Sequence, residues 1–299
     1  MKKKLVLSLT ALFVLSACAG KVNKPGELEP QTYKIGTAIT NKAVVTEPKD
    51  DKKGEFESNV TYITVALDDK DAIAYVLIDE AQNAFEFDAT SIEPFEGRKT
   101  KKELGNDYGL NWFEQVAALE EYVTGKTIAE VKAGDPASDL NSTVSISVDN
   151  FIATLEEAAA NAVTYNDVVG IASSSSVNGT EENGAVEIVT TVAAVATDKD
   201  GNVVYAFVDE SQLKADIANG VATPTGSDLT KGQQKEAYGM SEKGMTEWYL
   251  QVKHLTDWAV GKNADAISKA AEDSDVTSTV TIYPGSFINT LVSALSKVK

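Results

Sequence analysis

Alternating apolar and polar positions mark two pairs of strands along the chain. In the first pair, residues 60–67 and 73–78 alternate and are rich in β-branched side chains, and the acidic run 68–71 separates them. The same arrangement returns over residues 189–208 around the turn 198–202, which contains Gly and Asn. Each pair therefore predicts an antiparallel β-hairpin.

A helical pattern follows the first hairpin. Trp112, Val116, Leu119 and Val123 recur every three or four residues, and Gly125 closely follows this apolar stripe. The spacing places the four side chains on one face of a helix, and glycine commonly ends a helix. The other elements expected are a helix over 128–132, a strand over 143–147 that leads into the last helix of its half, and last helices over 149–162 and 284–297.

Internal repetition divides the chain into two copies. The segment Tyr75-Val-Leu-Ile-Asp-Glu returns 130 residues later as Tyr205-Ala-Phe-Val-Asp-Glu. Other recurring pairs are Thr100 with Thr230, Lys101 with Lys231, Trp112 with Trp248 and Gln115 with Gln251. The second copy carries an insertion at 241–246, after which the offset becomes 136. Each copy is far longer than a solenoid repeat and can bury its own core.

The repetition sets the predicted architecture. We expect an α+β fold of two tandem homologous domains, at residues 33–164 and 167–299. Each domain is expected to be an antiparallel β-hairpin or sheet packed with two to three helices.

The start of the chain resembles a bacterial lipoprotein signal peptide over residues 1–17. Three lysines precede an apolar stretch too short to span a membrane, and the stretch ends in Leu-Ser-Ala-Cys18, similar to a lipobox. The resemblance implies that Cys18 is lipidated, with 18–32 as a flexible stalk on the extracytoplasmic face of the cell membrane. The alternative is a plain secretory signal with an incidental cysteine.

Composition narrows the classes of function. Cleavage at Cys18 would remove three of the 27 basic residues, so 24 would face 45 acids and the net charge would move from −18 to −21. Such a charge repels nucleic acid, so a nucleic-acid partner is not expected. Cys18 is the only cysteine, so the chain forms no internal disulfide and no thiolate metal cage.

The reactive side chains argue against an enzyme. His254 is the only histidine, and the matching position of the first copy is Ala118. A catalytic triad or a histidine-based metal site would therefore rest on one residue in one copy. The acidic turns 68–71 and 198–201 lack the further oxygen ligands of a calcium loop and are expected to be hairpin turns. We predict no catalytic residues and no metal site.

The recurring aromatic and basic residues admit two interpretations. Trp112 and Trp248 begin matching helices and are expected to pack in the core, the alternative being a flat ligand stacked on the indole. The basic residues near these helices, interpreted as solvated loop charges, are Lys101, Lys102, Lys231 and Lys235.

Each copy closes on a similar phrase in which hydroxyl and aliphatic residues alternate. The phrases are DLNSTVSISVDNF over 139–151 and DVTSTVTIYPGSF over 275–287. Here the chain resembles the FMN-binding domain of bacterial surface lipoproteins, which occurs singly or in tandem. In that family the flavin is joined through its phosphate to a threonine or serine in a motif like Asp-x-x-Ser-Gly-Ala-Thr.

The resemblance implies a set of cofactor-binding residues. The hydroxyls that would carry FMN are Ser145 and Thr281, and the residues matching the Asp and Ser of the motif are Asp139, Ser142, Asp275 and Ser278. The following helix would offer its N-terminal amides to the phosphate. Thr and Val replace the Gly-Ala pair of the motif in both copies, and the same letters also suit a plain strand with its hydroxyls outward.

The functional expectation follows from the anchor and the resemblance. We expect a lipid-anchored extracytoplasmic binding or carrier protein with two FMN-binding-domain-like modules that relays electrons through flavin. Its partners would then be a flavin transferase and a membrane electron donor. The alternative is a non-catalytic surface protein, structural or ligand-binding, that has lost the flavin.

Overall fold

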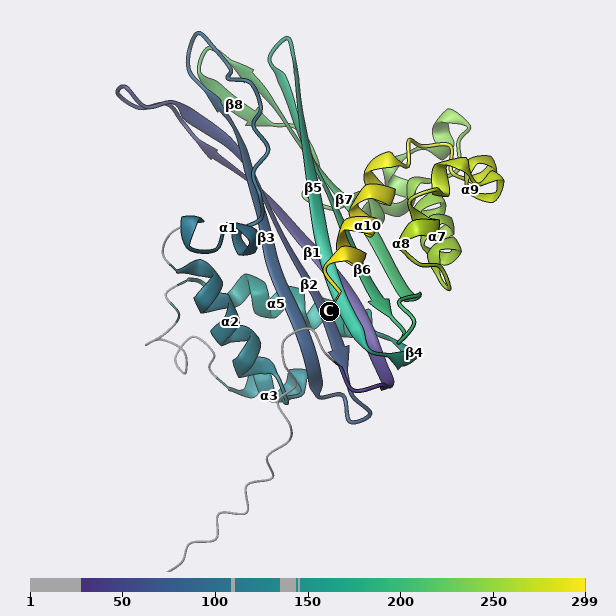
Figure 1. Ribbon diagram of the computed structural model, residues 1–299. Helices are drawn as coiled ribbons and strands as arrows, with labels where there is room; N and C mark the ends of the chain where they lie inside the picture. The colour runs from purple at the N-terminus through teal and green to yellow at the C-terminus, as the bar shows by residue number, and fades with distance from the viewer. Residues whose placement is uncertain (1–27, 109–110, 135–143, 145, 299) are drawn as a thin grey trace, which may run out of the picture.

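Two four-stranded antiparallel sheets pack face to face, and helices cover the outer face of each (Figure 1). The computed structural model describes residues 28–108, 111–134, 144 and 146–298. The first sheet has the order β3-β2-β1-β4 and the second the order β5-β6-β7-β8. The strands are β1 (Gln31–Thr46), β2 (Gly54–Leu67), β3 (Ile73–Phe87), β4 (Val163–Val168), β5 (Gly170–Glu182), β6 (Ala185–Thr197), β7 (Val203–Ala218) and β8 (Val221–Pro224).

Each sheet and its helices form what we call a module. The first module adds α1 (Lys101–Leu104), α2 (Trp112–Val123), α3 (Ile128–Ala133) and α5 (Asp149–Ala160) to the first sheet. The second adds α6 (Lys231–Gln234), α7 (Trp248–Ala259), α8 (Ala264–Ile267), α9 (Ser274–Thr279) and α10 (Gly285–Ser296). The 3-10 turns are η1 (Gly105–Tyr108), η2 (Lys235–Tyr238), η3 (Ser241–Lys243) and η4 (Ala270–Glu272). The predicted α+β architecture of two sheet-and-helix modules is confirmed.

Strand β2 shows why the sheets lie in the middle of the molecule. Ile63 and Val65 face the helices of their own module, whereas Tyr62 and Ala66 face the second sheet. A strand buried on both faces needs apolar residues at successive positions, which is the composition of this segment. The result is a four-layered arrangement of helices, sheet, sheet and helices.

The two modules share the core between the sheets. Phe85 of the first module packs with Ile188 and Leu213 of the second. Further along the sheets, the Tyr205 hydroxyl of the second module donates to Thr37 Oγ1 of the first at 2.9 Å. Each module therefore completes the burial of the other.

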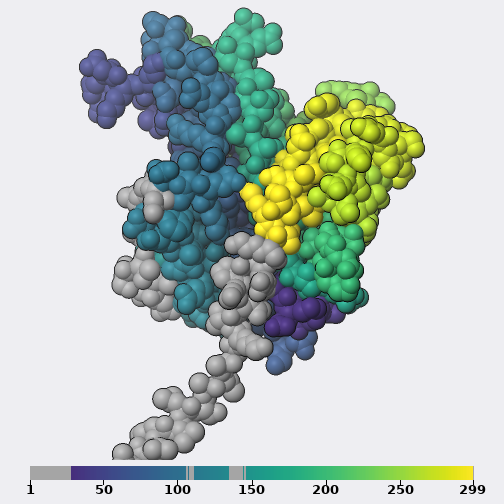
Figure 2. All heavy atoms as spheres, in the orientation of Figure 1, coloured from purple at the N-terminus to yellow at the C-terminus, as the bar shows by residue number. Residues whose placement is uncertain are grey.

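The last helix of the chain also joins the modules. In Figure 2 the yellow end of the chain lies against the teal surface of the first module. Lys297, just after α10, places its Nζ 2.6 Å from Glu103 Oε1 of the first module. Both side chains are partly exposed, so we expect this ion pair to add little to the stability of the fold. It marks the place where the end of α10 meets the first module.

Helix α5 approaches strand β1 so closely that one position must be glycine. A β-carbon at Gly36 would lie 2.1 Å from the Ala158 carbonyl oxygen and 2.7 Å from the Ala162 amide nitrogen. These are backbone atoms and cannot move aside as a flexible side chain could. Gly36 therefore sets the distance between this helix and the first sheet.

Most predicted elements are present, but the sheets are larger than predicted. Both hairpins are confirmed, and the helices expected at 112–124, 128–132, 149–162 and 284–297 are present within one or two residues at most ends. The second strand of each hairpin is longer than predicted, because β3 continues beyond 78 to Phe87 and β7 beyond 208 to Ala218. The prediction did not include β1, β4, β5 and β8.

The strand predicted before the last helix is wrong. The described residues of 143–147 form no strand. In the second copy the matching residues 279–283 begin at the last residue of helix α9 and form no strand either. The Asp273 side chain caps α9 by accepting from the Asp275 amide at 2.8 Å. The Thr277 hydroxyl donates to the Asp273 carbonyl at 3.0 Å. Short polar side chains thus bond to their own helix, and this favours a turn over an extended strand.

Candidate ligand-binding site

Four recurring residues build the same polar cluster in each module, which we call the buried cluster. It consists of Asp79, Glu80, Thr100 and Lys101 in the first module and Asp209, Glu210, Thr230 and Lys231 in the second. The acidic pair lies on the third strand of the module, and the Thr-Lys pair begins a short helix beside it. Sequence repetition is therefore matched by structural repetition at this place.

The aspartate of each cluster holds the start of the short helix. In the second module, Asp209 accepts from the Thr230 hydroxyl at 2.6 Å and from the Gly232 amide at 2.9 Å. In the first module, the Thr100 hydroxyl donates to Asp79 at 2.7 Å. Thr100 and Thr230 also form capping boxes at these helices. The carboxylates thus fix the loop from which the lysines project.

The lysines of the cluster are buried and ion-paired. Lys231 Nζ lies 2.5 Å from Glu210 Oε2, and Lys101 Nζ lies 2.5 Å from Glu80 Oε1. The interpretation of these two lysines as solvated loop charges is wrong. Each ammonium lies beside the tryptophan of its own module, at 5.9 Å from the Trp248 ring centroid in the second. The carboxylate partner and the aromatic ring together replace water around the charge.

The other two basic residues of that prediction behave differently. Lys102 is half-buried, and its Nζ lies 2.6 Å from Glu120 Oε1. Lys235 is exposed, as predicted.

Burial perturbs the acids of the cluster. Burial raises the pKa of Asp209 to about 6, because desolvation outweighs the hydrogen bonds that favour the ionised form. The pKa of Asp79 is raised for the same reason. Burial alone would lower the pKa of Lys231, but the adjacent Glu210 carboxylate raises it above its ordinary value.

The raised pKa of Asp209 makes a pH-dependent contribution to stability. The folded protein binds the proton more tightly than the unfolded chain, so this contribution is present below about pH 4 and is lost as the pH rises through about 6. We expect the free energy of unfolding of the wild type, relative to Asp209→Asn, to fall by about 2 kcal/mol between pH 4 and pH 7. Urea unfolding of both proteins across this range measures it.

A partly exposed aspartate, Asp88, provides the control of opposite sign. Hydrogen bonds from the Thr90 hydroxyl and amide lower the pKa of Asp88 to about 2. Its stabilising contribution is therefore present at neutral pH and is lost as the pH falls. A difference between wild type and Asp209→Asn that does not change with pH would contradict the assigned environment of Asp209.

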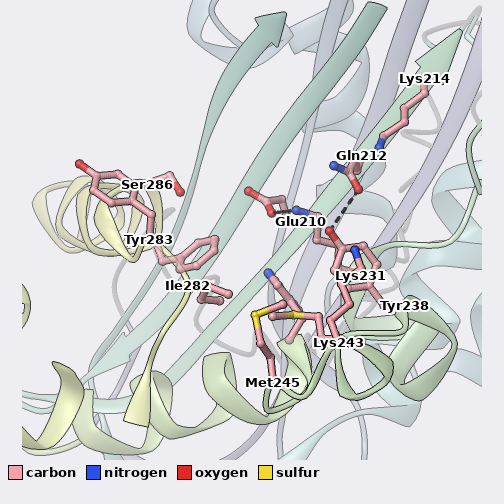
Figure 3. A pocket seen from close by; sticks show the side chains of 13 residues that line it. Glu210, Gln212, Lys214, Lys231, Tyr238, Lys243, Met245, Ile282, Tyr283 and Ser286 are labelled. Carbon is pink, nitrogen blue, oxygen red and sulfur yellow. Dashed lines mark hydrogen bonds and ion pairs between the residues drawn. The ribbon is translucent and has the colours of Figure 1, made fainter. Parts of the chain in front are cut away.

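A pocket of about 480 Å³ opens beside the buried cluster of the second module (Figure 3). Its apolar wall contains Tyr238, Met240, Met245, Trp248, Tyr283 and Phe287, and its charged residues are Glu210, Lys214, Lys231 and Lys243. Figure 3 shows Tyr283 and Ser286 on one side, with Lys231 and Tyr238 across from them. Such a mixture of aromatic wall and a few convergent charges is typical of small-molecule sites.

Features specific to the second copy build this pocket. The insertion 241–246 forms η3 and contributes Lys243 and Met245. Glu247 accepts from the Met240 and Ser241 amides at 3.2 and 2.9 Å and so folds the inserted loop back on itself. The duplicated scaffold thus carries a lining that the first copy lacks.

A recurring glutamine positions the segment that closes the pocket. Gln251 Oε1 accepts from the Thr281 amide at 2.6 Å and from the Ile282 amide at 3.1 Å. Gln115 of the first module accepts from the Ile146 amide at 3.1 Å in the same way. This glutamine recurs in the sequence, but its recurrence alone predicted no role. Its recurrence on an otherwise apolar helix face was the available signal.

The residues implied by the flavin resemblance lie in different places. Thr281 is exposed, next in sequence to Ile282, which lines the pocket, and its hydroxyl donates to Gln251 Oε1 at 3.1 Å. Asp275 and Ser278 lie on α9 and do not line the pocket. The remaining positions lie outside the described residues: Cys18, Asp139, Ser142 and Ser145.

The tryptophans fit the core interpretation. Trp112 packs edge-to-face on Phe151, and Trp248 on Phe287, with ring centroids 6.3 and 5.7 Å apart. Both indoles are buried in the helix-facing cores, and Trp248 also lines the pocket. The same ring can therefore serve packing and ligand contact.

The other candidate residues lie at structural positions, and His254 Nε2 is buried with no hydrogen-bond partner among the described residues. His254 Nε2 lies 3.8 Å from Asp275 Oδ1 on the outer helices. Asp68 and Asp198 close the predicted hairpin turns by accepting from backbone amides two and four residues on. Among the described residues, no group of three or more His, Cys, Asp or Glu is placed to hold a metal ion. Within the same part of the chain, no helix has the length and apolar character needed to cross a membrane.

Comparison of the chain with known protein families, curated proteins and solved structures finds no match.

Proposed function

We propose that this protein is a lipid-anchored extracytoplasmic binding protein whose second module takes up a small anionic ligand with a flat apolar part. The observation that carries the proposal is the pocket lining, in which an aromatic and methionine wall surrounds three lysines and one glutamate. The chain as a whole has a net charge of −18. A pocket with excess positive charge in so acidic a protein favours an anion by local contact.

The three lysines differ in their availability to a ligand. Lys231 is neutralised by Glu210 and Lys214 by Glu187, at 2.5 and 3.0 Å. Lys243 is exposed, and no ion pair is recorded for it among the described residues. Lys243 is therefore the cation that we expect to meet the ligand, while the buried pair supports the wall.

Tyr283 provides a surface for the apolar part of the ligand. Its side chain is 84% exposed, the highest fraction among the large apolar side chains of the described chain. An exposed aromatic ring at a pocket commonly gains stabilisation when a flat ligand covers it. We expect the ligand to lie between this ring and the wall formed by Trp248 and Tyr238.

The probe for this proposal is anilinonaphthalene sulfonate, which combines a flat apolar ring system with one anionic group. We expect the wild type to bind the probe saturably. The rise in probe fluorescence measures this binding. Lys243→Gln and Tyr283→Ala should each weaken binding about fivefold. This corresponds to about 1 kcal/mol of binding free energy, the size expected for the loss of one charge or one ring contact. The matched control is Lys199→Gln. Lys199 is exposed, lies in the turn between β6 and β7, and does not line the pocket. Equal binding by all four proteins would contradict the assignment of the site.

A flavin is the second candidate ligand, and one observation favours it. Thr281 presents an exposed hydroxyl directly before the pocket-lining residues Ile282 and Tyr283. The backbone amides of Thr281 and Ile282 already engage Gln251, so this glutamine keeps partners if the hydroxyl is modified. The residues present thus fit an FMN attached at Thr281, with Trp248 and Tyr238 along the ring system. The bound flavin would supply electron transfer.

Mass spectrometry tests the flavin candidate. The protein produced together with a flavin transferase should gain the mass of FMN minus one water, and Thr281→Ala should remove this increment. Thr277→Ala is the matched control, because its hydroxyl lies on α9 and bonds to its own helix. An unmodified mass and a colourless sample would eliminate the flavin and leave the noncovalent ligand.

The anchor is tested separately. We propose that lipidated Cys18 tethers the protein to the membrane, with no other membrane contact required. Cys18→Ala should move the protein from the membrane fraction to the soluble fraction. Retention of this variant in the membrane fraction would contradict the lipid anchor.

A further inference from the structure

The first module has a smaller pocket that borders the same buried cluster, but most of its lining comes from other positions. This pocket has a volume of about 260 Å³ and is lined by Gln82, Arg98, Lys99, Lys101, Leu104 and Asp107. Gln82 and Lys101 match Gln212 and Lys231 of the second-module pocket under the repeat. The two pockets therefore share part of the scaffold, but Arg98 and Lys99 match Asp228 and Leu229, which do not line the second-module pocket.

The charge of this pocket comes from two side chains. Arg98 is the only arginine of the whole chain, and both Arg98 and Lys99 are exposed. No ion pair is recorded for either within the described residues. Lys101 is neutralised by Glu80 at 2.5 Å. Asp107 is the one carboxylate that lines this pocket, and the nearby Glu103, which is paired with Lys297, also interacts electrostatically with Lys99.

The loop that carries Arg98 is held in place on both sides. The Arg98 amide donates to Asn83 Oδ1 at 2.7 Å, and the Asn83 side chain is buried in the first sheet. Any side chain at Gly97 would meet Val177 of the second sheet at 3.0 Å. Thr100, two residues further, is the buried cap of α1. A loop fixed in this way loses little conformational freedom when a ligand binds.

We propose that this pocket is a second binding site, selective for a small oxyanion that bears a carboxylate or phosphate group. A guanidinium presents two parallel N–H donors to such a group, and the ammonium of Lys99 adds a point charge. The small volume excludes the large flat ligand of the second module. The protein would then hold two ligands of different size in two versions of one scaffold.

Calorimetric titration at low ionic strength tests the second site, with inorganic phosphate and succinate as probes. We expect the wild type to bind at least one of these anions, and the better probe identifies the group recognised. Arg98→Gln should weaken that binding at least tenfold, and Arg98→Lys should give an intermediate loss because it keeps the charge without the paired donors. Lys199→Gln, which removes an exposed lysine of the second module, should leave the affinity unchanged.

Two results would overturn this proposal. One is the absence of heat of binding for both anions at millimolar concentration. The other is an unchanged affinity in Arg98→Gln. Arg98 is exposed, so its variants should keep the thermal midpoint of the wild type, and this measurement excludes misfolding as the cause of a loss. Both variants should also still bind anilinonaphthalene sulfonate, which separates this site from the second-module pocket.

Discussion

Replacing Glu210 by glutamine is expected to lower the free energy of unfolding by about 3–5 kcal/mol. The substitution keeps the shape of the side chain but leaves the Lys231 ammonium buried without its carboxylate, from which it lies 2.5 Å away. Glutamine can still accept from the Thr191 hydroxyl, which donates to Glu210 at 3.0 Å. The loss should therefore report the unpaired charge, and urea unfolding monitored by circular dichroism measures it.

An exposed ion pair gives the matched control for this result. Lys253 and Asp257 lie one helical turn apart, with side chains 65% and 63% exposed. Asp257→Asn should cost about 0.5 kcal/mol or less, because water screens the pair. If Glu210→Gln cost no more than this control, Lys231 would have to be accessible to water, in contradiction to its burial.

Truncation of Phe85 is expected to have a comparable effect through packing. Phe85→Ala should cost about 3–5 kcal/mol, since it empties a fully buried position between the sheets. The ring lies 5.0 Å from that of Phe95 and packs with Ile188 and Leu213 of the other module. Because the core is shared, both modules should lose stability together in a single unfolding transition.

Hydrogen exchange resolved along the chain distinguishes shared from separate unfolding. We expect amides of β2 and of β6 to exchange faster in Phe85→Ala by similar factors. Tyr283→Ala is the control for loss of an aromatic ring, and it should change neither set because Tyr283 is exposed. Faster exchange confined to the first module would contradict the shared core.

The sequence predicts an element correctly where only one face of that element is buried, because its apolar residues then recur with the period of a helix or a strand. The stripe at Trp112, Val116, Leu119 and Val123 gave the right helix because only one side of it is buried. Strand β5 could not be found in this way, since it contains the run Ser173 to Ser176. Ser174 of this run is buried, and its hydroxyl pairs with that of Ser293 on α10 at 2.8 Å.

The site was harder to predict because its contacts join segments far apart in sequence. Lys231 was expected to be a solvated loop charge, yet it pairs with Glu210, which lies 21 residues earlier on strand β7. The repeat identified both residues as recurring pairs without showing that they meet. The pocket also depends on Lys243, which lies in the insertion, and on Tyr283, which stands opposite Ser147 in the repeat, so neither residue recurs.

The central claim is that the second-module pocket takes up a flat anionic ligand, and hydrogen exchange with and without anilinonaphthalene sulfonate tests it most directly. We predict that the probe slows exchange at residues 238–248 and 282–287, which border the pocket, and leaves 98–107 of the first module unchanged. Slower exchange at the hairpin ends, or no change near Trp248, would contradict the account.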